Sequence, residues 1–314
     1  MNIIILGAGA MGLLFGSKLS STNNVTLVDI NHELVDAINS NGVTVCENGC
    51  DSTYYPRAVS CSDGMEPADL IIIFVKTMFS RSALELNKSL IGPDTYVMTL
   101  QNGAGHEGVL LEFVRPEHAI IGTTQHNSSI LSLARLQHGG AGHTYIGSPV
   151  ADTIKLEAVA STFSMSGIET SVSNNVQKLI WEKIFTNVSA SALTAVLQCP
   201  LGFICSNDHA WSLCSQLIQE AVEVVKVEGF DFDFNEQLAS VRAVCENAPN
   251  GYTSIYSDMR NGRKTEVDAI NGAVVRASRH NGTFAHTHEI MVRLIHALED
   301  SRQLGAQNGA SHKP

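Results

Sequence analysis

The chain has 314 residues, of which 44% are apolar and 16% charged, so it is long enough for two soluble domains with sizeable cores. Its formal net charge of -11 argues against nucleic acid and against an anionic membrane surface as partners, and no apolar run is long enough to span a bilayer. Seven scattered cysteines without a second metal-spaced pair, and no basic leader before the first apolar run, predict a cytoplasmic protein with reduced thiols and no metal site.

The N-terminal segment joins a strand, a glycine-rich turn and a helix. The aliphatic run Ile3–Leu6 predicts a buried parallel strand, and the apolar spacing over Met11–Leu19 predicts a helix. The G-x-G-x-x-G between them suits a tight turn, a close approach of a pyrophosphate and close packing of helix on strand. An ordinary glycine-rich turn is the alternative. We predict that the phosphates of a dinucleotide bind the backbone of Gly7, Ala8, Gly9, Ala10, Met11 and Gly12.

The second predicted strand, Val25–Ile30, carries an acidic residue near its end. Asp29 stands at about the distance past the glycines at which a carboxylate binds the adenosine ribose hydroxyls. Such a carboxylate repels the 2′-phosphate of NADP, and no Arg or Lys occurs in Asp29–Ala37, so this segment favours NAD(H). The alternative is that Asp29 only ends the strand.

Two polar residues follow later strands of the same predicted sheet. Lys76 comes directly after Leu70–Val75, and Asn102 closely follows Tyr96–Leu100. The carboxyl ends of parallel strands form the ligand crevice of a doubly wound sheet, so we predict that Lys76 and Asn102 contact a cofactor or substrate. A surface lysine and a turn former before glycine are the alternatives.

The remaining patterns divide the chain into an α/β part and an all-α part. Ala119–Thr124 predicts a strand, residues 125–148 predict antiparallel strands that complete the sheet, Leu156–Ser166 predicts a helix and Ile168–Val172 a last strand. Beyond these, only helical patterns occur, over 176–196, 208–228, 234–246, 254–261, 265–281 and 287–303.

We therefore predict an α/β chain with an N-terminal Rossmann-like dinucleotide-binding domain followed by an all-α C-terminal domain. The first domain spans 1–174, and a helical substrate and catalytic domain spans 175–304. The polar, glycine-rich residues 305–314 predict a disordered tail. The apolar helices leave open whether the second domain buries a homodimer interface.

The first long helix of the second domain carries a polar stripe. Lys183, Asn187 and Ser191 are spaced at i, i+4 and i+8, which places them on one helical face. Such a stripe can hold a small oxyanion, and Lys183 can donate a proton to a carbonyl oxygen that is receiving a hydride. A solvated face with one surface lysine is the alternative.

Five motifs resemble the ketopantoate reductase (2-dehydropantoate 2-reductase) family over nearly the whole chain. They are LGAGAMG at Leu6–Gly12, VKT with Lys76, LQNG with Asn102, WEKIFTN with Lys183 and Asn187, and SDMRNGRKTEVDAINGAV with Glu266 inside it. The resemblance implies that a 2-oxo acid, 2-dehydropantoate, is reduced to D-pantoate with NADP(H), the reductive step of pantothenate biosynthesis.

The resemblance also implies a role for individual residues. Lys76, Asn102 and Ser128 would lie beside the cofactor, and Asn102 would also face the substrate. Lys183 would be the proton donor, with Asn187 and Ser254 binding the substrate. Glu266 would contact the cofactor and help to fix both Lys183 and the substrate. We leave the pKa of Lys183 open, because burial lowers it and Glu266 opposes that change.

The sequence departs from the family pattern at three positions. Asp29 and Ile30 stand where NADPH-using members carry an Arg, so we expect a preference for NADH. Ser191 and Leu201 replace polar residues that face the substrate in the family. Each hydrogen bond to the substrate that is lost there is worth about 1 kcal/mol. We therefore include Ser191 among the residues that bind the substrate.

Three functions remain compatible with these residues. The first is reduction of 2-dehydropantoate. The second is an NAD-dependent D-2-hydroxyacid dehydrogenase that acts on a branched or aromatic 2-oxo acid, as Asp29, Ser191 and Leu201 suggest. The third is a non-catalytic dinucleotide-binding protein, which the presence of Lys183 and Glu266 disfavours.

Overall fold

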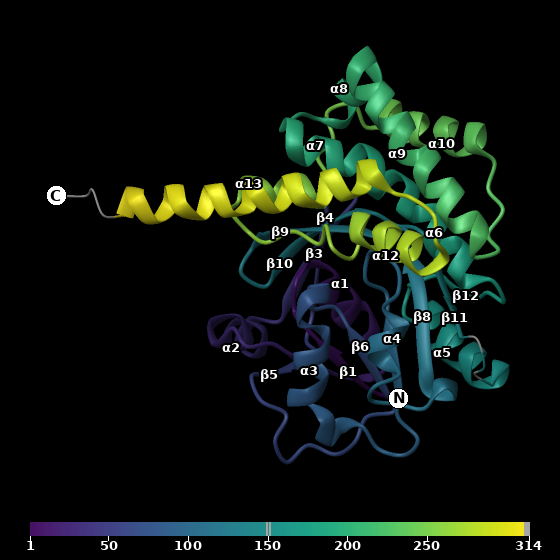
Figure 1. The fold of residues 1–314 in the computed structure, drawn as a ribbon. Helices are drawn as coiled ribbons and strands as arrows, with labels where there is room; N and C mark the ends of the chain where they lie inside the picture. Colours follow the sequence, from purple (N-terminus) through teal and green to yellow (C-terminus); the bar gives the residue numbers. More distant parts are fainter. Residues whose placement is uncertain (149, 151, 311–314) are drawn as a thin grey trace. The chain divides into compact units, whose positions relative to one another are not determined.

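The computed structural model describes residues 1–148, 150 and 152–310 (Figure 1). The chain divides into two compact units, a first unit of Met1–Gln101 and His106–Leu179, and a second unit of Asn102–Gly105 and the chain from Ile180 onward. The sequence suggested a single boundary near residue 174. The division lies slightly later, and a short turn, Asn102–Gly105, joins the second unit because its backbone packs there.

The first unit is built on an eight-stranded sheet with the order β12-β11-β8-β7-β6-β1-β2-β5. Neighbouring strands from β5 to β8 are parallel, β11 runs antiparallel to β8, and β12 is parallel to β11. The strands are β1 (Asn2–Leu6), β2 (Asn24–Val28), β5 (Arg57–Val59), β6 (Leu70–Ile73), β7 (Tyr96–Thr99), β8 (Ala119–Thr124), β11 (Thr144–Gly147) and β12 (Thr170–Val172).

Continuous aliphatic runs make the centre of this sheet. Ile3, Ile4 and Ile5 are 0% exposed, as are all four residues of β6, Leu70–Ile73, which lies beside β1. A parallel strand covered on both faces needs apolar residues at every position, so the α/β prediction is confirmed. Helices of this unit are α1 (Ala10–Leu19), α2 (His32–Asn41), α3 (Ser80–Leu86), α4 (Glu107–Leu110) and α5 (Thr153–Met165).

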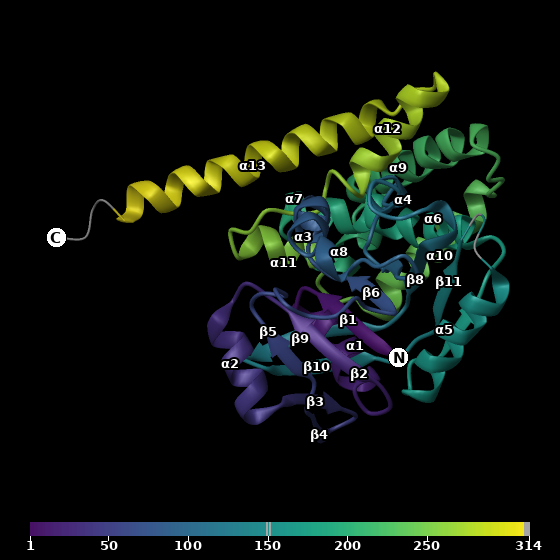
Figure 2. The same cartoon turned by 90° about the horizontal axis from the view of Figure 1, so that it is seen from below.

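A second, four-stranded sheet of the first unit has the order β4-β3-β10-β9 (Figure 2). Its strands are β3 (Val43–Glu47), β4 (Cys50–Tyr54), β9 (Asn127–Ser132) and β10 (Arg135–Gly140). We predicted that the segment 125–148 completes the main sheet, and this is wrong for most of it. β10 instead pairs in parallel with β3, and an Arg135–Asp51 ion pair of 2.8 Å joins β10 to β4, so only β11 enters the main sheet.

The second unit is helical, and its own apolar cluster forms a core separate from that of the sheet. Side-chain caps start two of its long helices, because Asn207 accepts the N–H of Ala210 and Asp233 accepts that of Glu236. The helices are α6 (Val176–Thr186), whose first four residues belong to the first unit, α7 (Ala192–Leu197), α8 (Leu201–Ser206), α9 (Asp208–Val227), α10 (Phe234–Asn247), α11 (Ser254–Arg260), α12 (Asn271–Asn281) and α13 (His286–Ala310). Among the described residues, no helix is long and apolar enough to cross a membrane.

Three features of the second unit differ from the sequence prediction. The segment 176–196 is interrupted by a π-helical turn, Asn187–Ser191, and α8 was not predicted at all. α12 begins at Asn271, so the helix predicted from 265 starts with a non-helical turn. α13 continues through Ala310 in place of the disordered tail predicted from 305, and residues 311–314 lie outside the described residues.

Candidate functional site

The glycine-rich turn after β1 is shaped by close contacts of its backbone. Gly7 has a φ of +98°, and a Cβ there would lie 2.7 Å from the backbone nitrogen of Val75. A Cβ on Gly12 would lie 1.9 Å from the carbonyl oxygen of Gly7, so α1 packs directly on the turn. Both glycines are therefore required by the fold itself, before any ligand is considered.

Gly9 differs from its two neighbours in the motif because the fold alone does not require it. It is exposed, and a Cβ built on it would have no heavy atom within 4 Å. It is also the N-cap of α1 and brings no side chain to cap the helix. The open space at the positive end of α1 fits a pyrophosphate, which explains a glycine here.

Asp29 follows β2 directly, beside the same turn. Its Oδ2 accepts the N–H of Ala8 at 2.7 Å, and its Oδ1 accepts the N–H of Asn31 at 2.9 Å. Among the described residues it forms no ion pair with a cation that would offset its charge. The carboxylate is thus held in place by two backbone groups, and each oxygen keeps a further lone pair for a ribose hydroxyl.

Lys76 and Ser128 lie in the first unit as well. Lys76 is half-buried in the loop that follows β6, immediately after the Val75 that Gly7 contacts. Ser128 lies on β9 opposite His138 of β10, and its hydroxyl oxygen is buried without a hydrogen-bond partner. An orphaned buried hydroxyl is rare, and a bound ligand would account for it.

A buried histidine pair next to Ser128 escaped the sequence analysis. Nδ1 of His126 lies 3.0 Å from Nε2 of His138, whose Nδ1 lies 2.7 Å from a carboxylate oxygen of Glu47. Lys18 of α1 binds the other oxygen of Glu47 at 3.0 Å. Burial, and next the neighbouring charge of His138, lower the pKa of His126 to about 4. Only strand pairing brings these residues together, because no local spacing relates them.

Lys183, on α6, is the predicted proton donor in the second unit. Burial lowers the pKa of Lys183 from its usual 10.5 to about 8, and the nearby Glu266 carboxylate partly opposes that change. The side chain as a whole is half-buried. The sequence left this pKa open, and in the structure the effect of burial is the larger of the two. An ammonium with this pKa is a suitable general acid near neutral pH.

The predicted Lys183–Asn187–Ser191 stripe is modified by the π-helical turn. Asn187 remains half-buried like Lys183, but Ser191 is only 4% exposed. The π-helical turn comprises Asn187–Ser191. Because a π-helix has more residues per turn than an α-helix, side chains after Asn187 point in directions that α-helical spacing does not predict. Ser191 is therefore more deeply buried than Lys183 and Asn187, which a single polar stripe at i, i+4 and i+8 did not predict.

Ser254 is the first residue of α11 and is exposed. Thr253 caps this helix by accepting the N–H of Tyr256 at 3.2 Å, and its hydroxyl lies 2.9 Å from that of Thr194 on α7. α11 thereby packs on the helix that carries the π-helical turn. Leu201, at the start of α8, is 7% exposed and belongs to the apolar core.

Asn102 and Glu266 lie in two turns of the second unit that contact each other. Gly103 has a φ of +103°, and a Cβ there would lie 2.2 Å from the carbonyl oxygen of Ala269. That oxygen also accepts the N–H of Ala104 at 3.3 Å. The turn after Asn102 is therefore held against the turn after Glu266, which explains its place in this unit.

The predicted site residues therefore form two groups, each described within its own unit. The first unit holds the glycine-rich turn, Asp29, Lys76 and Ser128; the second holds Asn102, Lys183, Asn187, Ser191, Ser254 and Glu266. The first group fits a dinucleotide, and the second presents a cation of lowered pKa with a carboxylate and amides. No group of three or more metal-binding side chains occurs in the part of the chain that the structure describes.

Comparison with known proteins gives the same family over both units. Models described as "Ketopantoate reductase PanE/ApbA" and its C-terminal domain match residues 3–150 and 175–299. The chain is 29% identical to the 2-dehydropantoate 2-reductase of Halobacterium salinarum over 98% of its own length and 100% of that protein. It is 31% identical to the 2-dehydropantoate 2-reductase of Streptococcus pyogenes serotype M1, over 95% of this chain and 98% of that one.

A solved structure is similar over the same length. The ternary structure of D-mandelate dehydrogenase with NADH and anilino(oxo)acetate matches with a TM-score of 0.89 and 30% identity, covering 96% of this chain and 99% of that one. Two family models that together span most of the sequence, and a relative at 31% identity, agree with the Rossmann-like and helical units seen here. The chain belongs to the ketopantoate reductase family of nicotinamide-dependent oxidoreductases.

Proposed function

We propose that this protein reduces the ketone of 2-dehydropantoate to D-pantoate, with Lys183 as the proton donor and NADH as the preferred cofactor. The observation that carries the reaction type is the Lys183 ammonium, whose pKa burial lowers to about 8 beside the Glu266 carboxylate. The substrate is inferred from the relatives, which are named 2-dehydropantoate 2-reductases.

The chemistry assigns distinct tasks to the two groups of residues. A bound nicotinamide cofactor supplies the hydride, and the glycine-rich turn and Asp29 bind and orient it. Negative charge develops on the former carbonyl oxygen, and the Lys183 ammonium stabilises that charge and then transfers its proton. Asn187 and Ser254 offer hydrogen bonds that orient the 2-oxo acid. Glu266 keeps the lysine pKa from falling further.

The preference for NADH is supported by the way in which Asp29 is held. Because backbone N–H groups of Ala8 and Asn31 bind both carboxylate oxygens, the side chain is not free to swing away from a 2′-phosphate. A fixed anion at the ribose favours a hydroxyl and disfavours a phosphate. The similar D-mandelate dehydrogenase was solved with NADH, which is in line with this proposal.

A second candidate activity is an NAD-dependent D-2-hydroxyacid dehydrogenase for branched or aromatic 2-oxo acids. Ser191 is buried and Leu201 belongs to the apolar core, so neither position offers the amide groups expected for a hydroxyl-bearing substrate. The similar structure of D-mandelate dehydrogenase supports the same alternative. Both candidates use the same proton donor and differ only in the acid bound.

Initial rates of NADH and NADPH oxidation with 2-dehydropantoate, 2-ketoisovalerate and phenylpyruvate test the proposal. The highest kcat/KM with 2-dehydropantoate and NADH supports the first candidate, and a higher value with either of the other acids supports the second. If NADPH gives the higher kcat/KM, the role of Asp29 is wrong. Tight dinucleotide binding without turnover of any acid would contradict both activities and favour a non-catalytic binding protein.

A further inference from the structure

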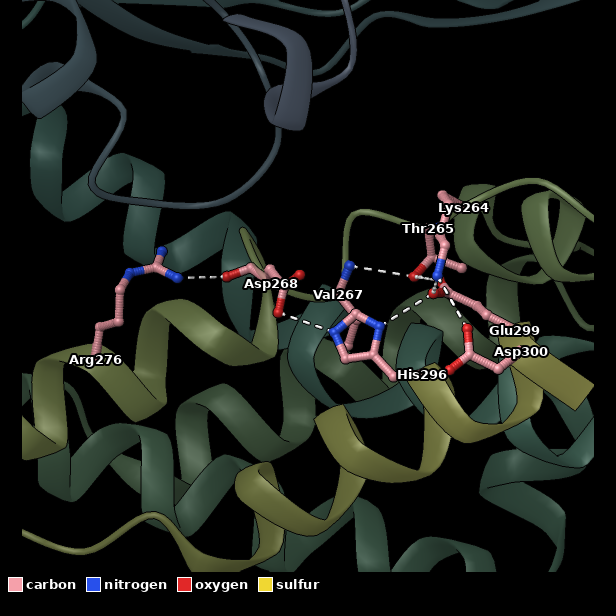
Figure 3. A network of polar contacts seen from close by, with 8 residues as sticks. All are labelled: Lys264, Thr265, Val267, Asp268, Arg276, His296, Glu299 and Asp300. Atoms are coloured by element: carbon pink, nitrogen blue, oxygen red, sulfur yellow. Dashed lines mark hydrogen bonds and ion pairs between the residues drawn. The ribbon is translucent and has the colours of Figure 1, made fainter. Parts of the chain in front are cut away.

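A buried carboxylate of the last helix holds the turn that carries Glu266 (Figure 3). Glu299 of α13 is 4% exposed. Its Oε1 accepts the backbone N–H of Thr265 at 2.8 Å and the hydroxyl of Thr265 at 2.7 Å. Thr265 is also buried, and its hydroxyl oxygen lies 3.3 Å from the backbone nitrogen of Val267. Glu266 is thus flanked on both sides by residues of this hydrogen-bonded turn.

The second carboxylate oxygen of Glu299 connects the turn to two cations. Oε2 lies 3.0 Å from Nδ1 of His296 and 3.2 Å from Nζ of Lys264. Nε2 of His296 lies 3.0 Å from a carboxylate oxygen of Asp268, at the other end of the turn. Burial lowers the pKa of His296, but its hydrogen bonds to the Asp268 and Glu299 carboxylates more than offset that change, so the pKa of the ring is raised.

Arg276 of α12 extends the same arrangement to the turn that follows Asn102. One guanidinium nitrogen donates to the backbone carbonyl of Asp268 at 2.7 Å. A second guanidinium nitrogen donates to the backbone carbonyl of Ala104 at 3.5 Å. The turns of Asn102 and Glu266 are therefore joined by a side chain as well as by the backbone contact at Ala269. All of these residues belong to the second unit.

We propose that Glu299 and His296 are positioning residues, which hold the 265–269 turn so that the Glu266 carboxylate stays near the Lys183 ammonium. This inference rests on the proposed role of Lys183 as proton donor. In this proposal neither Glu299 nor His296 contacts substrate or cofactor, and both act through the backbone of the turn.

The contacts of Glu299 are specific to an ionised carboxylate. A buried carboxylate that accepts a backbone N–H, a hydroxyl and two cationic donors is satisfied on both oxygens. In Glu299→Gln one oxygen is replaced by an NH₂ group, which would face His296 and Lys264, themselves donors. Gln keeps the shape of the Glu299 side chain but not its hydrogen bonds. The turn therefore loses part of its hydrogen bonding to α13 without the opening of a large cavity.

The expected consequence is a shift in the pKa of Lys183. Glu266 raises this pKa by its charge, so a turn that loosens and moves Glu266 away lowers it below the wild-type value. The pKa is measured from the pH dependence of the rate at which Lys183 is modified by an amine reagent, followed by peptide mass spectrometry. Hydrogen exchange of the amides in 264–270 is measured in parallel. Neither readout needs turnover, so a failure of the positioning role can be distinguished from a failure of the proposed function.

We expect Glu299→Gln to lower the pKa of Lys183, to speed exchange in 264–270, and to lower kcat by about tenfold to a hundredfold while the KM for NADH stays unchanged. The matched control is Asp300→Asn, because the Asp300 carboxylate lies 3.3 Å from Nζ of Lys264 and, among the described residues, makes no hydrogen bond to the backbone of the 265–269 turn. Should Glu299→Gln not fold, His296→Gln replaces it, since His296 is more exposed and bridges the same turn.

The positioning role is overturned if the folded variant keeps the wild-type pKa of Lys183 and wild-type exchange in 264–270. It is equally overturned if Asp300→Asn changes both readouts as much as Glu299→Gln does. A lowered pKa together with faster local exchange in Glu299→Gln alone supports it.

Discussion

The two groups of site residues are made in different ways. In the first unit, the proposed dinucleotide site is a backbone feature: three glycines within six residues, a helix N-terminus and one carboxylate bound to the same turn. In the second unit, the proposed proton donor and its partners are side chains from separate segments, including Lys183 on α6 and Glu266 in the turn before α12. A backbone site tolerates little change in the size of its residues, whereas a side-chain site depends on the charge and position of its side-chain groups.

This difference also separates the tasks of the two units in the proposed reaction. The proposed backbone site would bind a cofactor through geometry that exists before the ligand arrives. The side-chain site lowers the pKa of one ammonium by burial and limits that change with one carboxylate. Substitutions in the first unit should therefore change stability and cofactor affinity, and substitutions in the second should change kcat and its pH dependence.

The largest expected effect is that of Lys183→Ala. Removing the general acid should lower kcat for the 2-oxo acid by about 10²–10⁴-fold, while the Kd for NADH stays close to that of the wild type. Steady-state kinetics and NADH fluorescence titration measure the two quantities. Lys226→Ala is the matched control, because Lys226 is an exposed lysine of α9 in the same unit. A kcat within a few-fold of wild type would remove Lys183 from the mechanism.

Within the glycine-rich turn, Gly12→Ala and Gly9→Ala should differ sharply. A Cβ on Gly12 would meet the Gly7 carbonyl oxygen, so we expect Gly12→Ala to lower the free energy of unfolding by about 1–3 kcal/mol. Gly9→Ala meets no atom and should leave stability unchanged but weaken NADH binding. Thermal unfolding without cofactor and NADH titration separate the two effects. Equal NADH affinity of Gly9→Ala and wild type would contradict a pyrophosphate at this position.

The pH dependence of reduction should follow the protonation of Lys183. The protonated form is the donor and its pKa is about 8, so kcat/KM should be constant below that pH and fall about tenfold per unit above it. Glu266→Gln removes the charge that raises this pKa, so the decline should begin at a lower pH. A pH–rate profile for both proteins tests the direction. A decline that begins at higher pH in Glu266→Gln would contradict the expectation that the Glu266 charge raises the pKa of Lys183.

The smallest expected effect is on cofactor choice. Asp29→Ser removes the anion at the ribose, so the ratio of kcat/KM for NADH to that for NADPH should fall by about tenfold. Because Asp29 also binds the backbone of Ala8 and Asn31, both values fall, and the ratio is the diagnostic quantity. Asp36→Asn, at an exposed position of α2, is the control. An unchanged ratio would mean that the carboxylate only braces the turn.

The sequence predicted those parts of the molecule in which neighbours along the chain are neighbours in space. Strand β1, the glycine turn and α1 are contiguous, so composition and spacing were enough to place them. The pairing of β10 with β3 was missed, because the two strands are distant in sequence and nothing local encodes their register. The helix predicted from 265 failed for a related reason, since Thr265 binds Glu299, far along the chain, in place of a helical partner.

The sequence by itself therefore determined the α/β and helical units and the glycine-rich turn with its acidic residue, and it supplied the proposed proton donor, because each depends on residue type and short-range spacing. Only the tertiary structure decided the pKa of Lys183, the burial of Ser191 and the support of the Glu266 turn by α13. Burial and long-range hydrogen bonds depend on which segments pack together, and that information is not contained in the spacing of residues along one segment.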